Sequence, residues 1–536
     1  MGGSAHIGNG LIANHPMPSP QGEGGPLAVD EVETRAGKCP PPQKGTAHRL
    51  LPTSTLNYGC FLKGIIPMKK GFFDDRYLLN SDTAVQLYND YAKDLPIFDY
   101  HCHLSPKDIA EDRVYDNIGE LWLECDHYKW RMMRACGVAE NLITGDASWH
   151  DKFIAFASVM PRIIGSPVYA WAHLELKTYF GIVRPMNADS AEEIWQEANR
   201  KMADGSFSAR KLIIGSQVEA LCTTDDPADS LEYHKTLAED ETFPVKVLPS
   251  FRPDMACTGV AKENFKEYVE KIETVTGIDC DDFDEFLRAM DNRLDFFVAS
   301  GCVVSDISLG ALATETADYE EAKAVYKKGL RGKEITTEEE LAYADYMLIH
   351  FAKEYARRGM AMQLHFSAIR NNNTARFAAL GADCGNDSVG PAISVAALGR
   401  FFDAIEKDGG LPKTIVYTLN EPQYYELATM LGNFWGKEIP GRLQLGAAWW
   451  FCDHVEGIKN QLKTASATGA LGVFNGMLTD SRSFTSYPRH DFFRRILCSY
   501  VAEFVDNGEY DATPATLKKL IGDICIDNAR TYFKGE

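Results

Sequence analysis

The chain has 536 residues, 45% of them hydrophobic and 24% charged, a composition typical of a globular protein with one large or two ordinary domains. With 55 Lys and Arg against 76 Asp and Glu, the formal charge is −21, which argues against broad binding to nucleic acid or anionic membranes. No apolar run approaches the roughly 20 residues of a membrane span, and no secretory signal begins the chain, so we expect a cytoplasmic protein. The 13 cysteines are scattered and form no CxxC pair, which favours reduced thiols.

Residues 1–67 are rich in Gly, Pro, Ser, His and Asn and show no sustained apolar periodicity. Such a composition predicts a disordered N-terminal leader. Apolar patterning begins near Met68, and the spacing of Ala84 and Leu87 predicts a helix soon afterwards. We therefore expect one ordered domain over residues 68–536.

The next element is a short apolar run, residues 96–104, which contains His101 and His103. The run predicts a buried strand, and the two-residue period of a strand would place both imidazoles on the same face. Neutral imidazole is the commonest transition-metal ligand, so the pair could bind one ion. Taken alone, a His-x-His pair is a weak signal and more often marks two polar residues at the end of a strand.

Residues 105–215 show an almost wholly helical pattern. Trp122 and Trp130 lie at helical spacing, and Ser190 followed by Glu193 has the pattern of a capping box. The many aromatic residues of this stretch are typical of core packing. We interpret the stretch as a helical subdomain.

After residue 215 the pattern changes to short β-type runs separated by helical segments. These runs are residues 218–225, 245–250, 302–306, 362–365, 414–419, 443–447 and 474–480. Together with 96–104 they number eight, which predicts an α/β fold of the TIM type, a (β/α)8 barrel with a large helical insertion after strand 1. The alternative is a doubly wound open sheet. Because no Gly-x-Gly-x-x-Gly follows the first strand, a nucleotide-binding version of that sheet is disfavoured.

The active site of such a barrel lies at the carboxyl ends of its strands, so the polar residues that end or follow the predicted strands are the candidates for function. They are His101, His103, Asp225, Asp226, Arg252, Asp306, His365, Asn420, Glu421, Trp449, Trp450, Asp480 and Arg482. Because separate strands supply histidines and carboxylates to one mouth of the barrel, this set strengthens the prediction of a metal site.

Part of this set resembles the metal pattern of the amidohydrolase superfamily: the His-x-His pair, His365 after strand 5, and Asp480 after strand 8. The chain also resembles the uronate isomerase (glucuronate isomerase) family over residues about 68 to 536. The stretches that carry this second resemblance are residues 98–104, 126–131, 223–227, 370–373 and 478–484.

The resemblance implies a reversible aldose–ketose isomerisation, of D-glucuronate to D-fructuronate or of D-galacturonate to D-tagaturonate. A proton moves between C2 and C1 through an enediol or enediolate, which needs an acid–base pair and stabilisation of a developing oxyanion. The resemblance also implies one divalent ion, with zinc the expected metal, on His101, His103 and Asp480. His365 is a further ligand or a nearby polar group.

Three residues are candidates for acid–base chemistry. Asp306 at the end of strand 4 could transfer the proton, although an N-cap of the following helix is an equal alternative. Members of the family commonly have Ser-Asp-His here, whereas this chain has Ile307 after Asp306 and so lacks one imidazole. From the helical insertion, Tyr128 could act as acid or base while His127 hydrogen-bonds a sugar hydroxyl, with a structural role as the alternative.

A uronate also requires a donor for its carboxylate, which a guanidinium supplies best. The candidates are Arg482, two residues after Asp480, together with Arg210 and Arg370, although any one of them could instead form a surface ion pair. Trp449 could stack on the sugar or pack at the rim of the barrel.

Three other functions fit part of this evidence. The first is a metal-dependent hydrolase acting on another sugar acid, but two-metal hydrolases usually need a carboxylated Lys after strand 4, and residues 304–306 offer none. The second is a lyase or decarboxylase, and the third is a binding protein without activity. The only small-molecule partner that we expect is a uronate. The sequence leaves open whether the chain forms a homo-oligomer and which of the two uronates it uses.

Overall fold

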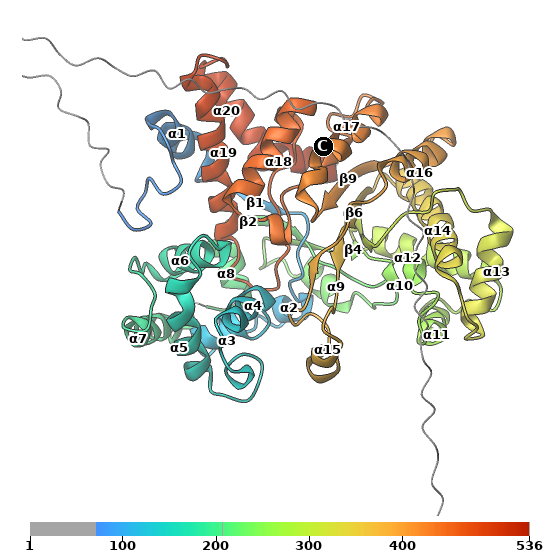
Figure 1. Ribbon diagram of the computed structural model, residues 1–536, viewed down its shortest axis with the longest axis horizontal. Helices are drawn as coiled ribbons and strands as arrows, with labels where there is room; N and C mark the ends of the chain where they lie inside the picture. The colour runs from blue at the N-terminus through green and yellow to red at the C-terminus, as the bar shows by residue number, and fades with distance from the viewer. Residues whose placement is uncertain (1–70, 206, 535–536) are drawn as a thin grey trace, which may run out of the picture. The chain divides into compact units, whose positions relative to one another are not determined.

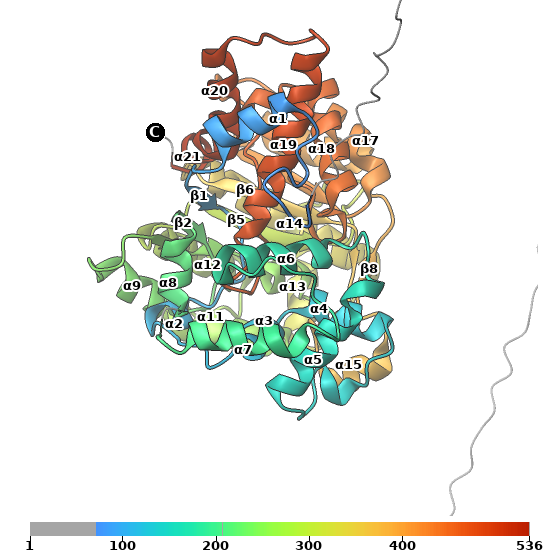
Figure 2. The same ribbon diagram turned by 90° about the vertical axis from the view of Figure 1, so that its left-hand side faces the viewer.

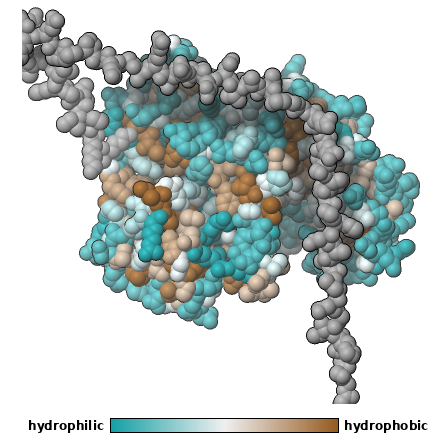
Figure 3. All heavy atoms as spheres, in the orientation of Figure 1, coloured by the Kyte–Doolittle hydropathy of each residue, from teal (hydrophilic) through white to brown (hydrophobic). Residues whose placement is uncertain are grey.

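The computed structural model describes residues 71–205 and 207–534. The leader predicted over residues 1–67 therefore lies outside the described residues. Within them every cysteine is a free thiol, and no helix is long and apolar enough to cross a membrane. On the face drawn in Figure 3, hydrophilic residues predominate and hydrophobic ones form small separate groups.

Parallel strands at the centre of the fold form two sheets, in the orders β1-β2-β3 and β10-β9-β6-β5-β4 (Figure 1). The strands are β1 (Ile97–Asp99), β2 (Val218–Cys222), β3 (Lys246–Leu248), β4 (Ser250–Phe251), β5 (Val304–Leu309), β6 (Ala361–Phe366), β9 (Lys413–Thr418) and β10 (Leu443–Leu445). Only Pro249 separates β3 from β4, and a parallel bridge between Asp225 and Phe251 continues the pairing from one sheet to the other.

The eighth predicted strand, residues 474–480, has no regular secondary structure, yet it lies in the eighth position of the barrel. At one end the backbone N–H of Asn475 donates to the side chain of Gln444 on β10, at 3.0 Å. At the other end the N–H of Asp480 donates to the carbonyl of His101, at 3.1 Å. The (β/α)8 prediction is therefore confirmed, with one irregular segment joining β10 to β1, and the doubly wound alternative is wrong.

The barrel interior is filled by side chains. Phe98, Ile415 and Tyr417 belong to a core cluster separate from the main one, and the hydroxyl of Tyr417 donates to Oε1 of Gln363 at 2.7 Å. Closed packing of this kind is usual in a barrel, because inward residues of alternate strands fill its centre in layers. The large main core lies between the strands and the surrounding helices.

Helices cover the outside of the barrel, as Figures 1 and 2 show. They are α9 (Glu232–Glu239), α10 (Asp254–Thr258), α11 (Phe265–Thr276), α12 (Phe283–Ala299), α13 (Tyr319–Leu330), α14 (Thr337–Arg357), α16 (Val395–Lys407), α17 (Tyr424–Leu431), α18 (Val455–Thr468), α19 (Pro488–Asp506), α20 (Pro514–Gly522) and α21 (Asn528–Lys534). The N-terminal helix α1 (Asp82–Leu87) packs on α19. Capping boxes begin both α13 and α14, which satisfies the first backbone N–H groups of each helix.

The predicted helical insertion is present between β1 and β2. It consists of α2 (Pro106–Ala110), α3 (Ile118–Leu123), α4 (His127–Ala135), α5 (Trp149–Val159), α6 (Pro167–Phe180), α7 (Ala191–Met202) and α8 (Ala209–Gly215). Trp122 and Phe153 are fully buried, which agrees with the core role expected for its aromatic residues. A second excursion, which no pattern predicted, consists of β7 (Ala368–Ile369), α15 (Thr374–Leu380) and β8 (Ser388–Val389) between β6 and α16.

Candidate active site

A cavity of about 450 Å³ lies at the carboxyl ends of the barrel strands. Most of its lining comes from strand ends, as expected, and the rest comes from the insertion and from the second excursion. The predicted site residues that line it are His101, His103, His127, Arg252, Asp306, His365, Arg370, Trp449, Trp450, Asp480 and Arg482.

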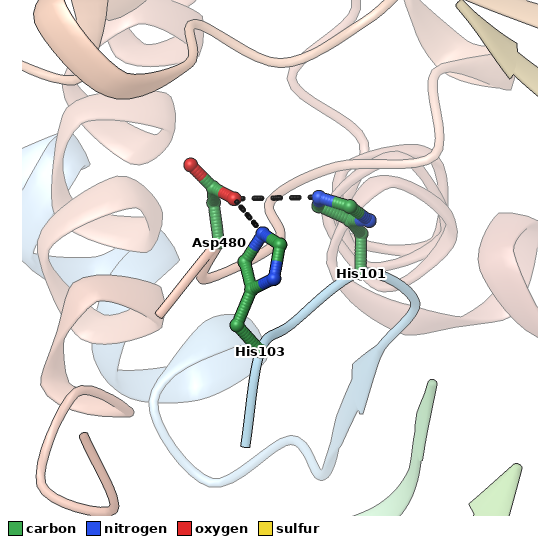
Figure 4. Close-up of side chains that lie close together, drawn as sticks. All are labelled: His101, His103 and Asp480. Atoms are coloured by element: carbon green, nitrogen blue, oxygen red, sulfur yellow. Dashed lines mark ion pairs between the residues drawn. The ribbon is translucent and has the colours of Figure 1, made fainter. Parts of the chain in front are cut away.

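His101, His103 and Asp480 meet at one point of this cavity (Figure 4). The Nε2 atoms of His101 and His103 lie 3.3 Å and 3.1 Å from the same Oδ1 of Asp480. The sequence predicted that both histidines lie within the first strand. Strand β1 ends at Asp99, so they follow the strand instead. Backbone hydrogen bonds to the segment around Asp480 hold them, since the N–H of His103 donates to the carbonyl of Ser481 at 2.9 Å.

Asp480 is the most heavily contacted carboxylate in the cavity. Its Oδ2 accepts from the indole of Trp449 at 2.7 Å and lies 3.4 Å from the hydroxyl of Tyr128. Burial would raise its pKa, but His101 and His103 hold the pKa of Asp480 well below its usual range. Its φ of 46° is strained for a residue with a side chain, and strain of this kind concentrates at functional sites.

A second group surrounds the fully buried Asp306. Its Oδ1 lies 2.7 Å from Nδ1 of His365, and its Oδ2 lies 2.9 Å from Nη1 of Arg252. Burial alone would raise the pKa of Asp306, but Arg252, His101 and His365 together lower it well below the usual range. Asp306 lies within β5, which continues to Leu309, so the alternative of a helix N-cap is wrong.

The donor atoms present suit a divalent metal ion. Those of His101, His103 and Asp480 lie within 4.8 Å of one another, as do those of His101, Asp306 and His365. Among the described residues, Nδ1 of His101 and Nε2 of His365 are buried without a hydrogen-bond partner, so both nitrogens are available to an ion. Nitrogen and carboxylate donors around one point are the ligands of zinc and similar ions. The cluster therefore fits a metal site.

His127 and Tyr128 begin helix α4, and their rings are stacked with centroids 4.7 Å apart. The Asp126 carboxylate caps the helix by accepting the N–H groups of Tyr128 and Lys129, which fixes the direction in which the helix enters the cavity. Burial lowers the pKa of the His127 imidazole and raises that of the Tyr128 hydroxyl well above its usual range. Near neutral pH His127 therefore lines the cavity as a neutral imidazole. Tyr128 is not among the lining residues, and its protonated hydroxyl lies behind them, 3.4 Å from Oδ2 of Asp480.

The three predicted arginines lie in different places. Arg482 and Arg370 line the cavity, and the guanidinium of Arg370 lies over the ring of Trp450 at 5.1 Å. Arg210 lies outside the cavity, because its guanidinium donates to the carbonyls of Ile109 and Ala110 and pairs with Asp240. Arg210 therefore ties α8 to α2 and is unavailable to a ligand in the cavity.

Known proteins match this chain over most of its length. A sequence model described as glucuronate isomerase matches residues 68–533. The chain is 48% identical over 461 residues to a uronate isomerase of Caldanaerobacter subterraneus subsp. tengcongensis, with 86% of this chain and 99% of the relative covered. A uronate isomerase of Caldicellulosiruptor bescii is 47% identical over 464 residues, with 87% of this chain and 99% of the relative covered.

The chain belongs to the glucuronate isomerase family.

Solved structures of family members agree with the fold. The crystal structure of a uronate isomerase from Thermotoga maritima superimposes with a TM-score of 0.81 at 35% identity and covers 87% of this chain and all of its own. That of a glucuronate isomerase from Caulobacter crescentus has a TM-score of 0.79 at 27% identity, covering 87% of this chain and 97% of its own. The resemblance inferred from the motifs is thus confirmed.

The family pattern also raised the question of Ile307, which replaces a histidine. Because side chains alternate along β5, Asp306 points into the cavity and Ile307 points the other way, where it is buried in the main core. A side chain at position 307 faces the helices, so the isoleucine removes no group from the cavity of this isomerase.

Some cavity residues were not assigned a role from the sequence. The sequence placed Arg252 at a strand end, directly after β4, which predicts that it lies in the cavity but does not predict its ion pair with Asp306. Asp254 and Lys262 carried no such signal, and neither did Asp383, which lies in the second excursion. Trp449 meets the site with its indole N–H on Asp480, a contact that neither sugar stacking nor rim packing had suggested.

Proposed function

We propose that this chain interconverts an aldose uronate and the corresponding ketose, D-glucuronate with D-fructuronate or D-galacturonate with D-tagaturonate. The observation that carries the proposal is that one cavity is lined by a metal-binding cluster, by Asp306 and His127, and by two arginines, with Tyr128 in contact with Asp480 beside it. The names of the relatives, which are uronate isomerases at 47–48% identity, support the same reaction. A volume of about 450 Å³ is ample for one hexuronate.

In this proposal His101, His103 and Asp480 hold one divalent ion, and His365 is a further ligand or a polar neighbour. Two imidazoles and a carboxylate favour zinc over magnesium or calcium, which prefer oxygen ligands. When bound, the ion orients the sugar oxygens and stabilises the negative charge that develops on them.

The reaction removes the proton at C2 of the aldose and delivers one to C1, while the hydroxyl proton at O2 passes to O1. Asp306 is the candidate carrier of the carbon-bound proton, because its carboxylate lines the cavity beside His101 and His365 of the metal-binding cluster. Tyr128 is the candidate acid for the oxygens, since its hydroxyl is protonated near neutral pH. His127, a neutral imidazole beside it, is placed to hydrogen-bond a sugar hydroxyl.

The sugar carboxylate requires a cation at the opposite end of the cavity from the reacting carbons. Arg482 and Arg370 are the candidates, because both line the cavity with partly exposed side chains. Arg252 is less available, since its guanidinium already pairs with Asp306 and Asp254. Trp449 then contributes to the site through Asp480.

The test incubates the zinc-loaded protein with each uronate in D₂O and follows the products by NMR. We expect a ketouronate to form, with deuterium exchange at C2 of the recovered aldose. His101→Ala, Asp480→Ala and Arg482→Ala should abolish conversion, whereas His150→Ala, a partly exposed residue of α5 outside the cavity, should leave it unchanged. A decarboxylated or dehydrated product would instead assign the chain to a lyase. Comparing the two uronates decides the substrate.

A further inference from the structure

The second excursion, residues 368–389, covers one side of the cavity. Its β7–β8 ribbon is short, with Ala368 paired to Val389 and Ile369 to Ser388. Helix α15 at its end has no buried residue, and Arg376 of the helix pairs with Glu140 of the insertion. The excursion therefore has little core of its own and depends on contacts with the rest of the domain.

Those contacts fasten the returning part of the excursion to helix α4 of the insertion. Nη1 of Arg131 donates to the carbonyls of Gly385, at 3.1 Å, and Asp387, at 2.8 Å, while Arg134 donates to the carbonyl of Cys384. Gly385 has a φ of +79°, and a Cβ atom there would lie 3.0 Å from the backbone carbonyl of His127. This close approach brings the residues just before Gly385 to the cavity.

The residue that reaches the cavity is Asp383. Its Oδ2 lies 2.9 Å from Nη2 of Arg482, and its Oδ1 lies 3.8 Å from Nη1 of Arg370. All three side chains line the cavity and are partly exposed, with 48% exposure for Asp383 against 30% for Arg482 and 38% for Arg370. One carboxylate oxygen thus faces each guanidinium, which is how a carboxylate ligand would be held between them.

We propose that Asp383 is an internal counter-anion, which occupies the anion position between Arg370 and Arg482 until the carboxylate of the sugar displaces it. The inference rests on the proposed function, because it concerns the carboxylate of the same substrate. A neutral sugar offers no charge to replace that of Asp383, so only a sugar acid leaves both guanidinium groups paired when Asp383 is displaced. Asp383 then competes with the substrate carboxylate for the two arginines.

The size of the effect follows from the exposure of the pair. Ion pairs between partly exposed groups are weak because water screens them and because long side chains lose freedom in forming them. Displacing Asp383 should therefore weaken sugar-acid binding by only about threefold to fivefold. A fully buried ion pair between Asp383 and the arginines would be harder for the sugar carboxylate to displace. The partial exposure of Asp383 therefore suits a side chain that the substrate must replace.

The test compares the zinc-loaded wild type with Asp383→Asn, which keeps the size of the side chain and removes its charge. KM for the uronate should fall about threefold to fivefold with kcat nearly unchanged, because the charge competes with binding and takes no part in the reaction. The Kd of D-gluconate, an anionic sugar acid without an aldehyde, should fall by the same factor in calorimetry.

The matched control is Arg376→Gln, which removes the ion pair between α15 and Glu140 of the insertion without touching the two arginines of the cavity. It should leave the KM and the Kd of D-gluconate unchanged. The inference is wrong if Asp383→Asn raises KM, which would make Asp383 a substrate contact, if it leaves the Kd unchanged, or if Arg376→Gln has the same effect. Because D-gluconate binding needs no turnover, failure of wild-type isomerisation would overturn the proposed function alone.

Discussion

At the scale of single residues, the site depends on side chains that share one carboxylate. His101 and His103 both approach Oδ1 of Asp480, while Trp449 and Tyr128 approach Oδ2. Burial lowers the pKa of His103 to about 4, so its imidazole is neutral and able to bind a metal at physiological pH. Removing Asp480 would leave the other four side chains without their common partner.

The residue-scale prediction concerns His103→Ala. Loss of one of three protein ligands should weaken zinc binding by at least about 100-fold, since even changes behind the ligands cost 10- to 100-fold. Isomerase activity should fall at least as far. Metal analysis after gel filtration and steady-state kinetics measure the two effects, with His150→Ala as the surface control. Stoichiometric zinc and unchanged activity in His103→Ala would remove this residue from the proposed ligands.

At the scale of elements, helix α4 is held in place by a buried cluster of charges. Nζ of Lys129 lies 2.6 Å from Oδ2 of Asp126 and 3.8 Å from Oε1 of Glu175 on α6, and Thr485 donates to the other oxygen of Glu175. The cluster lies directly beside His127 and Tyr128 in the chain. It therefore links the direction of both side chains to the packing of the insertion.

For this element we predict that Lys129→Met lowers the free energy of unfolding by about 3–5 kcal/mol, because two buried carboxylates lose their cation. Activity should fall as well, since α4 shifts at the residues that enter the cavity. Urea denaturation and kinetics measure both. The double variant Lys129→Met/Asp126→Asn restores part of the stability, because asparagine still caps the helix and one uncompensated charge is gone. A double variant no more stable than the single one would contradict this explanation.

A second element-scale feature joins β2 to β4. The buried Asp225 accepts from the Thr223 hydroxyl at 2.7 Å and from the N–H of Ser250 at 3.1 Å. Burial raises the pKa of Asp225 to about 7, against the lowering effect of these hydrogen bonds. Because the unfolded value is about 3.9, the folded protein keeps a proton that the unfolded chain has released between about pH 4 and 7.

The stability that this proton contributes is complete below about pH 4 and is lost as the pH rises through about 7. Asp225→Asn has no such proton, so its stability relative to the wild type should rise by up to about 1.4 kcal/mol per pH unit over that range. Urea denaturation at pH 5, 6 and 7 measures the difference. Asp189→Asn, at an exposed position, should show no such trend. If the difference in unfolding free energy between the wild type and Asp225→Asn does not change with pH, Asp225 is ionised in the folded protein.

At the scale of the whole molecule, the proposed metal connects the first and last segments of the barrel. His101 and His103 follow β1, whereas Asp480 lies at the end of the irregular eighth segment. Regular strand pairing is weakest there, since backbone hydrogen bonds from Asp480 and His103 make the junction without a strand in the eighth position. A bound ion should therefore stabilise the closure of the barrel.

The corresponding prediction is that removing the metal lowers the thermal midpoint by several degrees. An ion that binds only the folded state at 1,000 times its Kd adds about 4.1 kcal/mol, and this contribution disappears with a chelator. Differential scanning calorimetry before chelation, after it, and after addition of zinc measures the shift. His103→Ala should show little response to zinc. Equal thermal midpoints for the wild type with and without metal would show that the ion does not stabilise the barrel.

Sequence alone accounted for the features that depend on local pattern. Alternating strand and helix signals predicted the barrel and its insertion, and residues directly after strands, such as His101 and Asp480, could be assigned to one mouth because a barrel has one functional end. The motifs predicted the family, which the relatives confirm. These predictions succeed because periodicity and short-range motifs reside in neighbouring residues.

Tertiary structure alone decided which distant groups meet. Arg210 pairs with Asp240 and not with a ligand, Ile307 faces the core, and Asp383 reaches Arg482 from an excursion whose strands and helix were not predicted. The energy of each arrangement comes from contacts between segments far apart in the chain, and such contacts depend on how the barrel, insertion and excursion pack. A charged side chain pairs with whichever partner packing brings within reach, so the residue type predicted the chemistry and the fold determined its place.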